Sequence, residues 1–202
     1  MLIRRFEVYV KMLVGYFRNF IQLLFYRSPF VKNILCIRGT VFFALDGNFL
    51  FGDGIKINSG QIFNPIGGDA QTNIIIHPNA ILSISDNVGI SNSTIFCTNS
   101  ISIGADVLLG GGTRIYDTDF HCVSVYDRGT SSDTARSRSK PVTIGNGAFI
   151  GAHSIILKGV TVGERAVIQA GSLVHCSIPD DEIWGGNPIK FLKKINYGVQ
   201  SE

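Results

Sequence analysis

Aliphatic residues recur at every sixth position through the C-terminal half of the chain. Divided into sixes from Ile144, the sequence reads IGNGAF, IGAHSI, ILKGVT, VGERAV, IQAGSL and VHCSIP. The first place always holds isoleucine or valine, and the fifth usually holds a small residue or valine. This spacing matches neither the helical period of about 3.6 residues nor the two-residue alternation of a strand. It predicts short strands joined by tight corners, with every sixth side chain in a stacked core.

The same pattern continues toward the N-terminus. The upstream units are ISDNVG, ISNSTI and FCTNSI and, after a slip of one residue, IGADVL, LGGGTR and IYDTDF, with fainter traces toward residue 40. Three such sides make one coil of a prism, and successive coils pair backbone to backbone along its axis. We therefore expect an all-β fold, a parallel β-helix over residues 36–189. A helical segment, 1–35, precedes it, and a basic tail, 190–202, follows it.

Across residues 75–195 the repeat resembles the hexapeptide-repeat acyltransferases. The similarity is densest in PVTIGNGAFIGAHSIILKGVTVGERAVIQAGSLVHCSIPDDEIWGGNPIKFLKKI, which is similar to the closing coils of sugar and polysaccharide O-acetyltransferases. The resemblance implies a left-handed β-helix, acetyl-coenzyme A as the acetyl donor, and a homotrimer with active sites between subunits.

The repeat loses its register at His121. Counting by sixes through Leu109 and Ile115 puts the next inward aliphatic residue at position 121, and the register resumes only at Ile144. The polar and basic residues between them predict a protruding loop, 121–143, and long excursions from a rigid scaffold are commonly functional. Imidazole is well suited to removing a proton near neutral pH. The resembling family uses a histidine at this point as catalytic base, which makes His121 the candidate base.

The neighbouring acidic residues admit two interpretations. Asp119 or Asp117 could orient the imidazole of His121, as a carboxylate does in a catalytic triad. Alternatively, both are turn formers that accept backbone N–H bonds at a coil corner.

The candidate acceptor-binding residues are also open to two interpretations. Galactoside-type relatives carry an asparagine and an aspartate upstream of the histidine. This sequence departs from them, with Ile90 and Cys97 or Thr98 at the corresponding places, and Asn92 and Asn99 lie close by. Basic side chains of the loop could recognise an acidic sugar or a phosphate-bearing lipid carrier, or they could only keep the loop solvated. These loop residues are Arg128, Arg136, Arg138 and Lys140.

The resemblance also implies residues that hold the coenzyme. Small residues match the family's coenzyme positions, although the repeat itself demands small residues there; they are Gly151, Ala152, Ala170 and Gly171. The terminal GGNPIKFLKK resembles the family's closing G-x-P-x-[KR] motif. Within it, Lys190 and Lys193 match positions whose charges meet the phosphates of the coenzyme. The alternative for these lysines is a solvated basic tail.

Charge and apolar residues are distributed unevenly along the chain. Residues 1–40 carry seven basic residues and one acidic residue, so the remaining 162 residues have a net charge of −3. In the first segment large apolar residues recur at threes and fours, but no uncharged run approaches the roughly 20 residues of a membrane span. Residues 1–30 therefore predict a basic amphipathic helix. It either lies on an anionic membrane face or packs against the main domain or a neighbouring subunit.

Composition excludes several other classes. With 45% hydrophobic residues and 23 glycines the chain is not disordered, and its acidic main body offers no nucleic-acid footprint. The four cysteines form no C-x-x-C pair and favour a reducing cytoplasm. His77, His153 and His175 are too widely spaced to suggest the three-histidine zinc site of a β-helix carbonic anhydrase, and no metal is expected.

These observations favour an O-acetyltransferase that acts on a sugar hydroxyl in cell-surface polysaccharide or glycolipid biosynthesis. The enzyme would be cytoplasmic, with peripheral membrane contact if the N-terminal helix lies on a bilayer. One alternative is N-acetylation of an amino sugar or xenobiotic by the same apparatus. The other is a non-catalytic β-helix scaffold.

Overall fold

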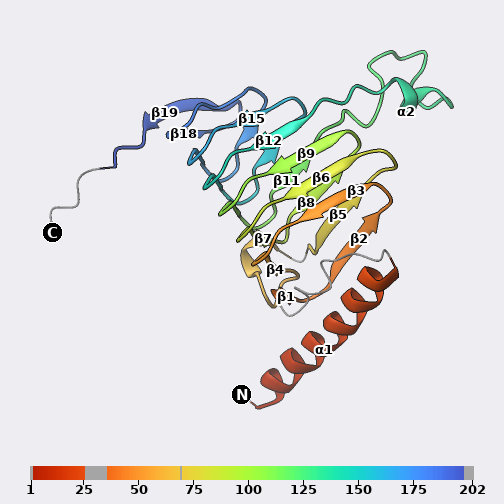
Figure 1. Cartoon of the computed structure of the whole chain (residues 1–202), viewed down its shortest axis with the longest axis vertical. Coiled ribbons are helices and arrows are strands. Elements are labelled where there is room, and N and C mark those ends of the chain that lie inside the picture. Colours follow the sequence, from red (N-terminus) through yellow and green to blue (C-terminus); the bar gives the residue numbers. More distant parts are fainter. Residues whose placement is uncertain (1, 26–35, 69, 198–202) are drawn as a thin grey trace.

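The computed structural model describes residues 2–25, 36–68 and 70–197, with side chains of the first helix described from Val8 onward. Three sheets form the sides of a prism, and one long helix lies across its N-terminal end (Figure 1). The prism is a left-handed parallel β-helix, which confirms the parallel β-helix predicted from the repeat and the left hand implied by the family resemblance. Residues 26–35 of the expected N-terminal segment and 198–202 of the expected tail lie outside the described residues.

Each side of the prism collects one short strand from each coil. Sheet A comprises β1 (Ile37–Arg38), β4 (Lys56–Asn58), β7 (Gly89–Ser91), β10 (Leu108–Leu109), β13 (Phe149–Ile150), β16 (Val167–Ile168), β18 (Glu182–Gly185) and β19 (Lys190–Lys194). Sheet B comprises β2 (Val41–Leu45), β5 (Thr72–Ile76), β8 (Thr94–Cys97), β11 (Arg114–Tyr116), β14 (Ile155–Ile156) and β17 (Leu173–Val174). Sheet C comprises β3 (Asn48–Phe51), β6 (Ile81–Ile84), β9 (Ser100–Ile103), β12 (Val142–Ile144) and β15 (Thr161–Val162).

The six-residue repeat is visible as columns of stacked side chains inside the prism. In sheet B, Ile95 pairs with Ile115, which pairs in turn with Ile156, and all three are fully buried. Such side chains fill the core with the same branched shape on every coil, so the volume enclosed by each coil stays constant. The core positions predicted from the sequence are therefore confirmed.

The corners between sheets C and A need left-handed backbone, which asparagine and aspartate tolerate. Asn87 and Asp106 occupy equivalent corners on successive coils with φ of 59° and 58°. Their side chains hydrogen-bond to each other, with Asn87 Nδ2 3.2 Å from Asp106 Oδ1. Local backbone preference and the contact between coils thus act on the same residues.

An excursion that the repeat did not predict connects β4 to β5. Residues 60–71 leave the prism at the corner between sheets A and B and contain a short 3-10 helix, η2 (Pro65–Gly67). The buried side chain of Asn92 holds this excursion in place. Its Nδ2 donates to the carbonyl of Asn64 at 2.8 Å, and its Oδ1 accepts from the backbone N–H of Gly60 at 2.7 Å.

Two further residues fit the excursion against the next coils. A Cβ atom on Gly111 would lie 2.8 Å from the backbone nitrogen of Gly67, so only glycine allows this close approach. On the following coil, His153 Nε2 lies 3.0 Å from the carbonyl oxygen of Ile66. His153 therefore has a structural contact at this corner, consistent with its expected place in an ordinary repeat unit.

The helix α1 (Leu2–Phe25) covers the first coil. Two side-chain amides replace the missing neighbour of β2, which is the terminal strand of sheet B. Asn19 accepts from Val41 N at 3.0 Å, and Gln22 donates to Val41 O at 3.0 Å. These bonds satisfy backbone groups that an open edge strand would leave unpaired. The expected helix is thus present and packs on the main domain.

A hairpin closes the opposite end of the prism. β19 runs antiparallel to β18, so residues 190–194 of the expected basic tail form a strand. Trp184 of β18 packs edge-on against Phe191 of β19, with ring centroids 5.9 Å apart.

Candidate active site

The long loop leaves the prism where β11 ends and returns at β12. Its two stems are paired at the base: Asp119 N donates to Arg138 O at 3.0 Å, and Lys140 N donates to Asp117 O at 2.9 Å. At its outer part lies the short helix α2 (Asp133–Arg136). Figure 1 shows the loop projecting from one corner of the prism. The predicted loop is confirmed, and its paired stems make its base a fixed extension of the prism.

His121 lies just beyond this base and contacts a carboxylate from α2. Its Nδ1 atom is 2.8 Å from Oδ2 of Asp133, and the imidazole side chain is 68% exposed whereas that of Asp133 is 7% exposed. The loop thus folds back so that a residue twelve positions along the chain supports the histidine. The Nε2 atom is the ring nitrogen that this contact leaves available.

Asp133 is held as an anion. Backbone N–H groups of Gly129 and Cys122 donate to its carboxylate at 2.8 and 2.7 Å. These two bonds, followed by the contact with His121, lower the pKa of Asp133 far below its usual range. Since an ionised carboxylate only accepts hydrogen bonds, the proton of the contact belongs to Nδ1 of His121. Neutral His121 therefore presents an unprotonated Nε2, which is the state required of a general base.

Neither aspartate predicted to orient His121 makes this contact. Asp117 is fully buried and accepts from the backbone N–H groups of Thr98 and Asn99 at 2.8 and 2.7 Å. Asp119 forms an ion pair with Lys158, whose Nζ lies 2.6 Å from its Oδ1. Asp117 matches the turn-forming alternative, because its carboxylate joins two coils at a corner. Asp133 occupies the orienting position, and the prediction of Asp117 or Asp119 for that position is corrected.

The sequence offered little to identify Asp133. It sits in the run SSDTAR, which reads as an ordinary polar turn, and its distance from His121 depends on the path of the whole loop. The buried carboxylate in a loop of exposed residues is a signal that only the fold reveals.

A cavity of about 510 Å³ opens beside His121. Aromatic rings line one side: Phe96 lies between His77 and Phe120, with ring centroids at 5.0 and 4.9 Å. Phe120 adopts a left-handed φ of 64°, which is unusual for a bulky residue and directs its ring into this group. Besides Pro78 and Ala135, the rest of the lining carries hydroxyl groups, from Thr98, Thr118, Thr134, Ser137 and Ser139. Rings and hydroxyls together suit a ligand with apolar faces and many polar groups.

The cysteine beside His121 is not a prepared nucleophile. Cys122 is buried, and its Sγ lies 3.4 Å from the carbonyl oxygen of Ser124. Burial, with the nearby Asp133 carboxylate, raises its thiol pKa. Burial and the charge of Asp117 likewise raise the pKa of Cys97 to about 12. Both thiols therefore stay protonated at neutral pH, which opposes attack by sulfur.

The predicted coenzyme residues lie on a different edge of the prism. Ala152 and Gly171 stack at the corner between sheets A and B, where Gly171 N donates to Ala152 O at 2.8 Å. His121 stands at the corner that follows sheet B. The corner at Ala170 and Gly171 is exposed, and a Cβ atom on Gly171 would meet nothing within 4 Å. We call this exposed corner, formed by Ala170 and Gly171, the ledge. Within a single chain the ledge does not lie next to His121.

Gly151 has a structural role at the same corner. A Cβ atom there would lie 2.4 Å from the backbone nitrogen of Ala170, so the close stacking of two coils requires glycine.

The two predicted lysines share one face of the terminal hairpin. Lys190 pairs with Gly185 and Lys193 with Ile183, and a register shift lies between the two pairs. Because their partners are two residues apart on β18, the two side chains point to the same side. Both lysines are exposed.

The predicted acceptor residues are separated by the fold. Asn92 is 2% exposed and serves the excursion at the other corner, as described above. Asn99 is exposed beside Thr98, which lines the cavity. Arg128 supports the loop itself, since its side chain donates to the carbonyl oxygens of Cys122 and Val123 at 3.3 and 2.9 Å. None of these three is among the residues that line the cavity, and Asn99 directly follows the lining residue Thr98 in the chain.

The other basic residues of the loop are exposed, and one is paired. Arg136 Nη1 lies 2.8 Å from Oδ1 of Asp127, while Arg138 and Lys140 belong to one of the two paired stems through their backbone atoms. Among the described residues, no group of three or more His, Cys, Asp or Glu side chains is arranged to hold a metal ion.

Comparison with known proteins places the chain in a family. Residues 141–176 match the model of the hexapeptide repeat of succinyl-transferase. The chain is 32% identical to galactoside O-acetyltransferase of Escherichia coli over 143 residues, covering 67% of this chain and 66% of that one. The chain is a hexapeptide-repeat acetyltransferase. The acyltransferase class expected from the family resemblance is thereby confirmed.

Two further relatives broaden the family comparison. A protein of E. coli provisionally named a lipopolysaccharide biosynthesis O-acetyltransferase is 26% identical over 173 residues, covering 83% of each chain. Among solved structures, a mutant of AntD, an N-acyltransferase from Bacillus cereus in complex with dTDP and coenzyme A, superposes with a TM-score of 0.64. The superposition covers 81% of each chain at 20% sequence identity, so this comparison shows a similarity of fold.

Proposed function

We propose that this acetyltransferase moves an acetyl group from acetyl-coenzyme A to a hydroxyl group of a sugar, with His121 as the general base. The observation that carries the proposal is the contact between His121 and the buried anion Asp133 at the mouth of an aromatic cavity. A base needs a fixed orientation and a ring nitrogen that can take a proton; in the neutral ring this contact places the proton on Nδ1 and leaves Nε2 for that role.

The proposed chemistry is direct transfer. Nε2 of His121 takes the proton of the acceptor hydroxyl as its oxygen attacks the carbonyl carbon of the thioester. The carbon–sulfur bond then breaks, and the imidazolium returns the proton to the departing thiolate, so the histidine ends neutral. Asp133 acts as a positioning residue, because its charge stabilises the imidazolium that forms between the two steps. The raised thiol pKa of Cys122 supports a route without an acyl-enzyme.

The cavity lining favours a sugar hydroxyl over a protonated amine. The rings of Phe96 and Phe120 provide flat apolar surfaces, and surrounding hydroxyl groups provide donors and acceptors. The described lining contains no carboxylate, whereas recognition of a charged amine usually involves one. The E. coli relatives named as O-acetyltransferases agree with this preference. The polysaccharide or glycolipid pathway remains part of the proposal.

The proposed assembly is a homotrimer in which a neighbouring subunit completes the site. His121 is largely exposed in the single chain, and the candidate coenzyme ledge at Ala170 and Gly171 lies at another corner. A second prism packed beside the first would bring its own ledge to the histidine. Small exposed residues on that ledge suit the close approach of a thin pantetheine chain, and Lys190 and Lys193 suit its phosphates.

The decisive assay measures free thiol released from acetyl-coenzyme A with candidate sugars, amino sugars and glycolipids. His121→Ala should lower the release by roughly 10² to 10⁴-fold with a hydroxyl acceptor, as removal of a general base does. The exposed His175, which is outside the cavity lining, provides the control substitution His175→Ala with unchanged rate. Release that survives His121→Ala contradicts the mechanism. Faster release with amines than with sugar hydroxyls contradicts O-acetylation, and no release or coenzyme binding at all favours a scaffold.

A mixing experiment tests the shared site. His121→Ala and Ala170→Trp should each be inactive alone, the second because a bulky side chain blocks the ledge. Trimers assembled from both variants should regain part of the activity, since some interfaces then pair an intact histidine with an intact ledge. Failure of complementation, with both variants inactive alone and still trimeric, would mean that the histidine and the ledge of one chain serve the same site.

A further inference from the structure

The helix α1 has two apolar faces, and only one of them is used by the prism. The inner face carries the fully buried Leu23 and the partly buried Tyr16 and Phe20, which pack on the core. A helix that only covers the end of a prism needs a polar outer face. The outer face of α1 instead carries large exposed apolar side chains, namely Val10, Leu13, Val14, Phe17, Ile21, Leu24 and Phe25.

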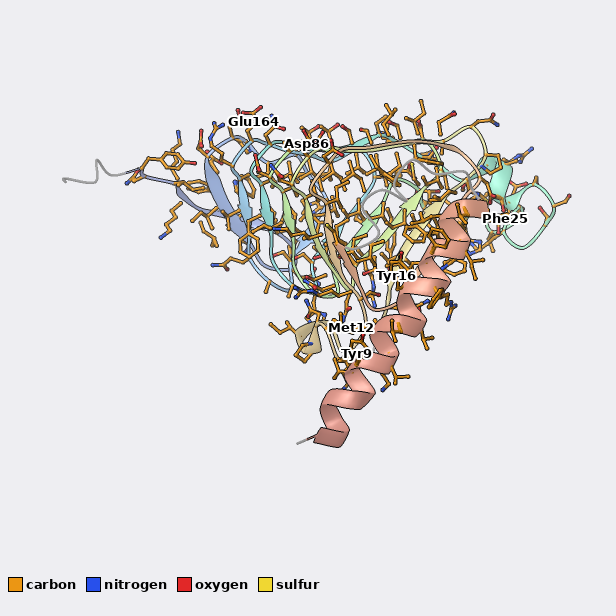
Figure 2. All side chains as sticks on the ribbon, turned by 60° about the horizontal axis from the view of Figure 1, so that its bottom comes forward. Tyr9, Met12, Tyr16, Phe25, Asp86 and Glu164 are labelled. Atoms are coloured by element: carbon orange, nitrogen blue, oxygen red, sulfur yellow. The ribbon has the colours of Figure 1, made fainter. Side chains whose placement is uncertain are left out.

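These seven residues, here called the outer ridge, form one continuous stripe. Their spacing of three and four residues places them on one side of an α-helix. They are strongly exposed: Phe17 is 60%, Ile21 64% and Phe25 80% accessible. Because α1 packs on β2 through its inner face, the outer ridge lies on the opposite side of the helix, with Val14 at its edge beside the first excursion. Figure 2 shows α1 on the outside of the prism, with Phe25 at its C-terminal end. An apolar surface of this extent marks a site of contact with a partner or a membrane.

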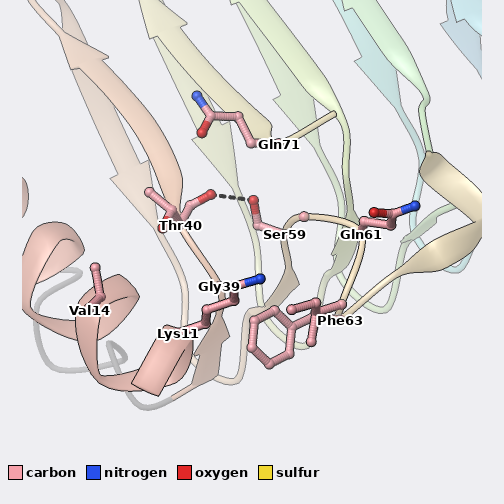
Figure 3. A pocket seen from close by; sticks show the side chains of 10 residues that line it. Lys11, Val14, Gly39, Thr40, Ser59, Gln61, Phe63 and Gln71 are labelled. Atoms are coloured by element: carbon pink, nitrogen blue, oxygen red, sulfur yellow. Dashed lines mark hydrogen bonds between the residues drawn. The ribbon is translucent and has the colours of Figure 1, made fainter. Parts of the chain in front are cut away.

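The flank of the outer ridge is basic and polar. Lys11 and Arg18 are seven residues apart, so they lie on the same flank, and both are exposed. From Val8 to Phe25 the helix contains no acidic residue. On this flank a cavity of about 370 Å³ separates α1 from the first excursion, and Figure 3 shows Lys11 of the helix close to Gly39 and Phe63 in its lining.

We propose that the outer ridge of α1 docks on the surface of an anionic lipid bilayer. The apolar side chains would enter the boundary between headgroups and acyl chains, while Lys11 and Arg18 remain at the level of the phosphates. No helix in the described part of the chain is long and apolar enough to span a membrane, so the contact is peripheral.

The charge of α1 favours a bilayer over a second copy of the chain as the partner of the outer ridge. Residues 2–25 carry four basic residues and one acidic residue, so two outer ridges packed together would bring two net positive helices close to each other. An anionic surface complements the basic flank. The remainder of the chain beyond residue 40 is net negative and is repelled by the same surface, which orients the molecule with its N-terminal end toward the lipid.

Flotation of the full-length protein with lipid vesicles tests the proposal. With vesicles containing about one-third phosphatidylglycerol in phosphatidylcholine, the protein should float, and pure phosphatidylcholine should bind it at least about tenfold more weakly. The double variant Phe17→Ser/Ile21→Ser should lose at least about tenfold in binding through lost apolar contact. Removing charge by Lys11→Gln and Arg18→Gln should cost about fivefold each.

Controls separate docking from folding and from catalysis. Leu50, exposed on β3 in the first coil, provides the matched substitution Leu50→Ser with unchanged binding. Thermal unfolding and thiol release with a water-soluble acceptor should be the same in the ridge variants and the unmodified protein. The proposal is overturned if the unmodified protein does not float. It is also overturned if Phe17→Ser/Ile21→Ser lowers the oligomeric mass in the absence of lipid, because the ridge then joins copies of the chain.

Discussion

Nδ1 of His121 lies 2.8 Å from Oδ2 of Asp133, and the other oxygen of that carboxylate accepts the backbone N–H of Cys122 at 2.7 Å. The same anion therefore holds both the imidazole and the backbone immediately after it. Rotation of the ring and movement of the loop backbone are restrained together. The orientation of the proposed base thus depends on a residue that itself faces away from solvent.

Replacing Asp133 with asparagine should lower kcat by about 10²-fold, in the range typical of a misplaced general base. The amide would donate to Nδ1 of His121 and leave the proton on Nε2, which is the wrong tautomer. The KM for acetyl-coenzyme A should stay the same, because Asp133 does not lie on the coenzyme ledge. Asp119→Asn, which removes only the ion pair with Lys158, should keep most of the activity. Equal losses in the two variants would contradict the assignment.

The pH dependence of stability should identify the same carboxylate. Backbone donors of Gly129 and Cys122, with His121, lower the pKa of Asp133 in the folded protein. Its contribution is therefore complete above the unfolded pKa of about 3.9 and is lost as pH falls toward the folded value. The difference in unfolding free energy between the unmodified protein and Asp133→Asn should shrink as the pH falls below about 4. A difference that grows as the pH falls below about 4 would exclude this account.

Cys122→Ser should retain thiol-release activity within about threefold, since the thiol is buried with a raised pKa and is not needed as a nucleophile. Rapid-quench kinetics should show no burst of acetylated enzyme. A covalent acetyl group on Cys122, trapped by mass spectrometry, would replace direct transfer with a two-step route.

Asn92→Ala should lower the free energy of unfolding by about 1–3 kcal/mol, because it leaves buried backbone groups of the first excursion unpaired. The KM for the sugar acceptor should not change, since Asn92 is at a different corner from the cavity. The exposed Asn99 is the natural comparison: Asn99→Ala should leave stability unaltered. An altered acceptor KM in Asn92→Ala with normal stability would restore the acceptor role expected from sequence.

Lys190→Gln and Lys193→Gln should each raise the KM for acetyl-coenzyme A by about threefold to tenfold through lost contacts with phosphate. Both lysines share a face of the β18–β19 hairpin, whereas Lys194, paired with Glu182, lies on the other. Lys194→Gln is therefore a matched control, and the effect of the first two should shrink with 3′-dephospho-coenzyme A. A uniform effect of all three substitutions would indicate nonspecific charge.

The β-helix could be predicted from the sequence because each coil imposes the same local requirement on its side chains. Each coil must place an aliphatic side chain such as Ile115 or Ile156 at one spot, so the pattern appears directly in the spacing. The break at His121 was visible for the same reason, since a regular series makes a missing member obvious. The first excursion was missed because the early repeats are faint and no regular series surrounds residues 60–71 to show a gap.

The partner of His121 was not accessible in this way. Asp117 and Asp119 are near His121 in the sequence, but β-helix geometry turns Asp117 into the prism wall and Asp119 toward Lys158. Asp133 reaches the histidine only because paired stems and α2 return the loop on itself. Proximity along the chain was therefore a poor guide to proximity in space within the loop.

Each stacked coil adds the same rise along the axis of the prism. Three strand steps in sheet B, β2 to β5 to β8 to β11, separate the covered end from the loop of His121, and each step rises by about 4.8 Å. With the thickness of α1, about 10 Å, the proposed base would stand roughly 25 Å above a bilayer that held the outer ridge. The height of the prism would then set a minimum length for a lipid-linked acceptor. A single sugar on a lipid would end short of His121, and a longer glycan would reach it. Acetylation rates measured across lipid-linked acceptors of increasing length should rise at the length that spans this gap, and equal rates at all lengths would contradict it.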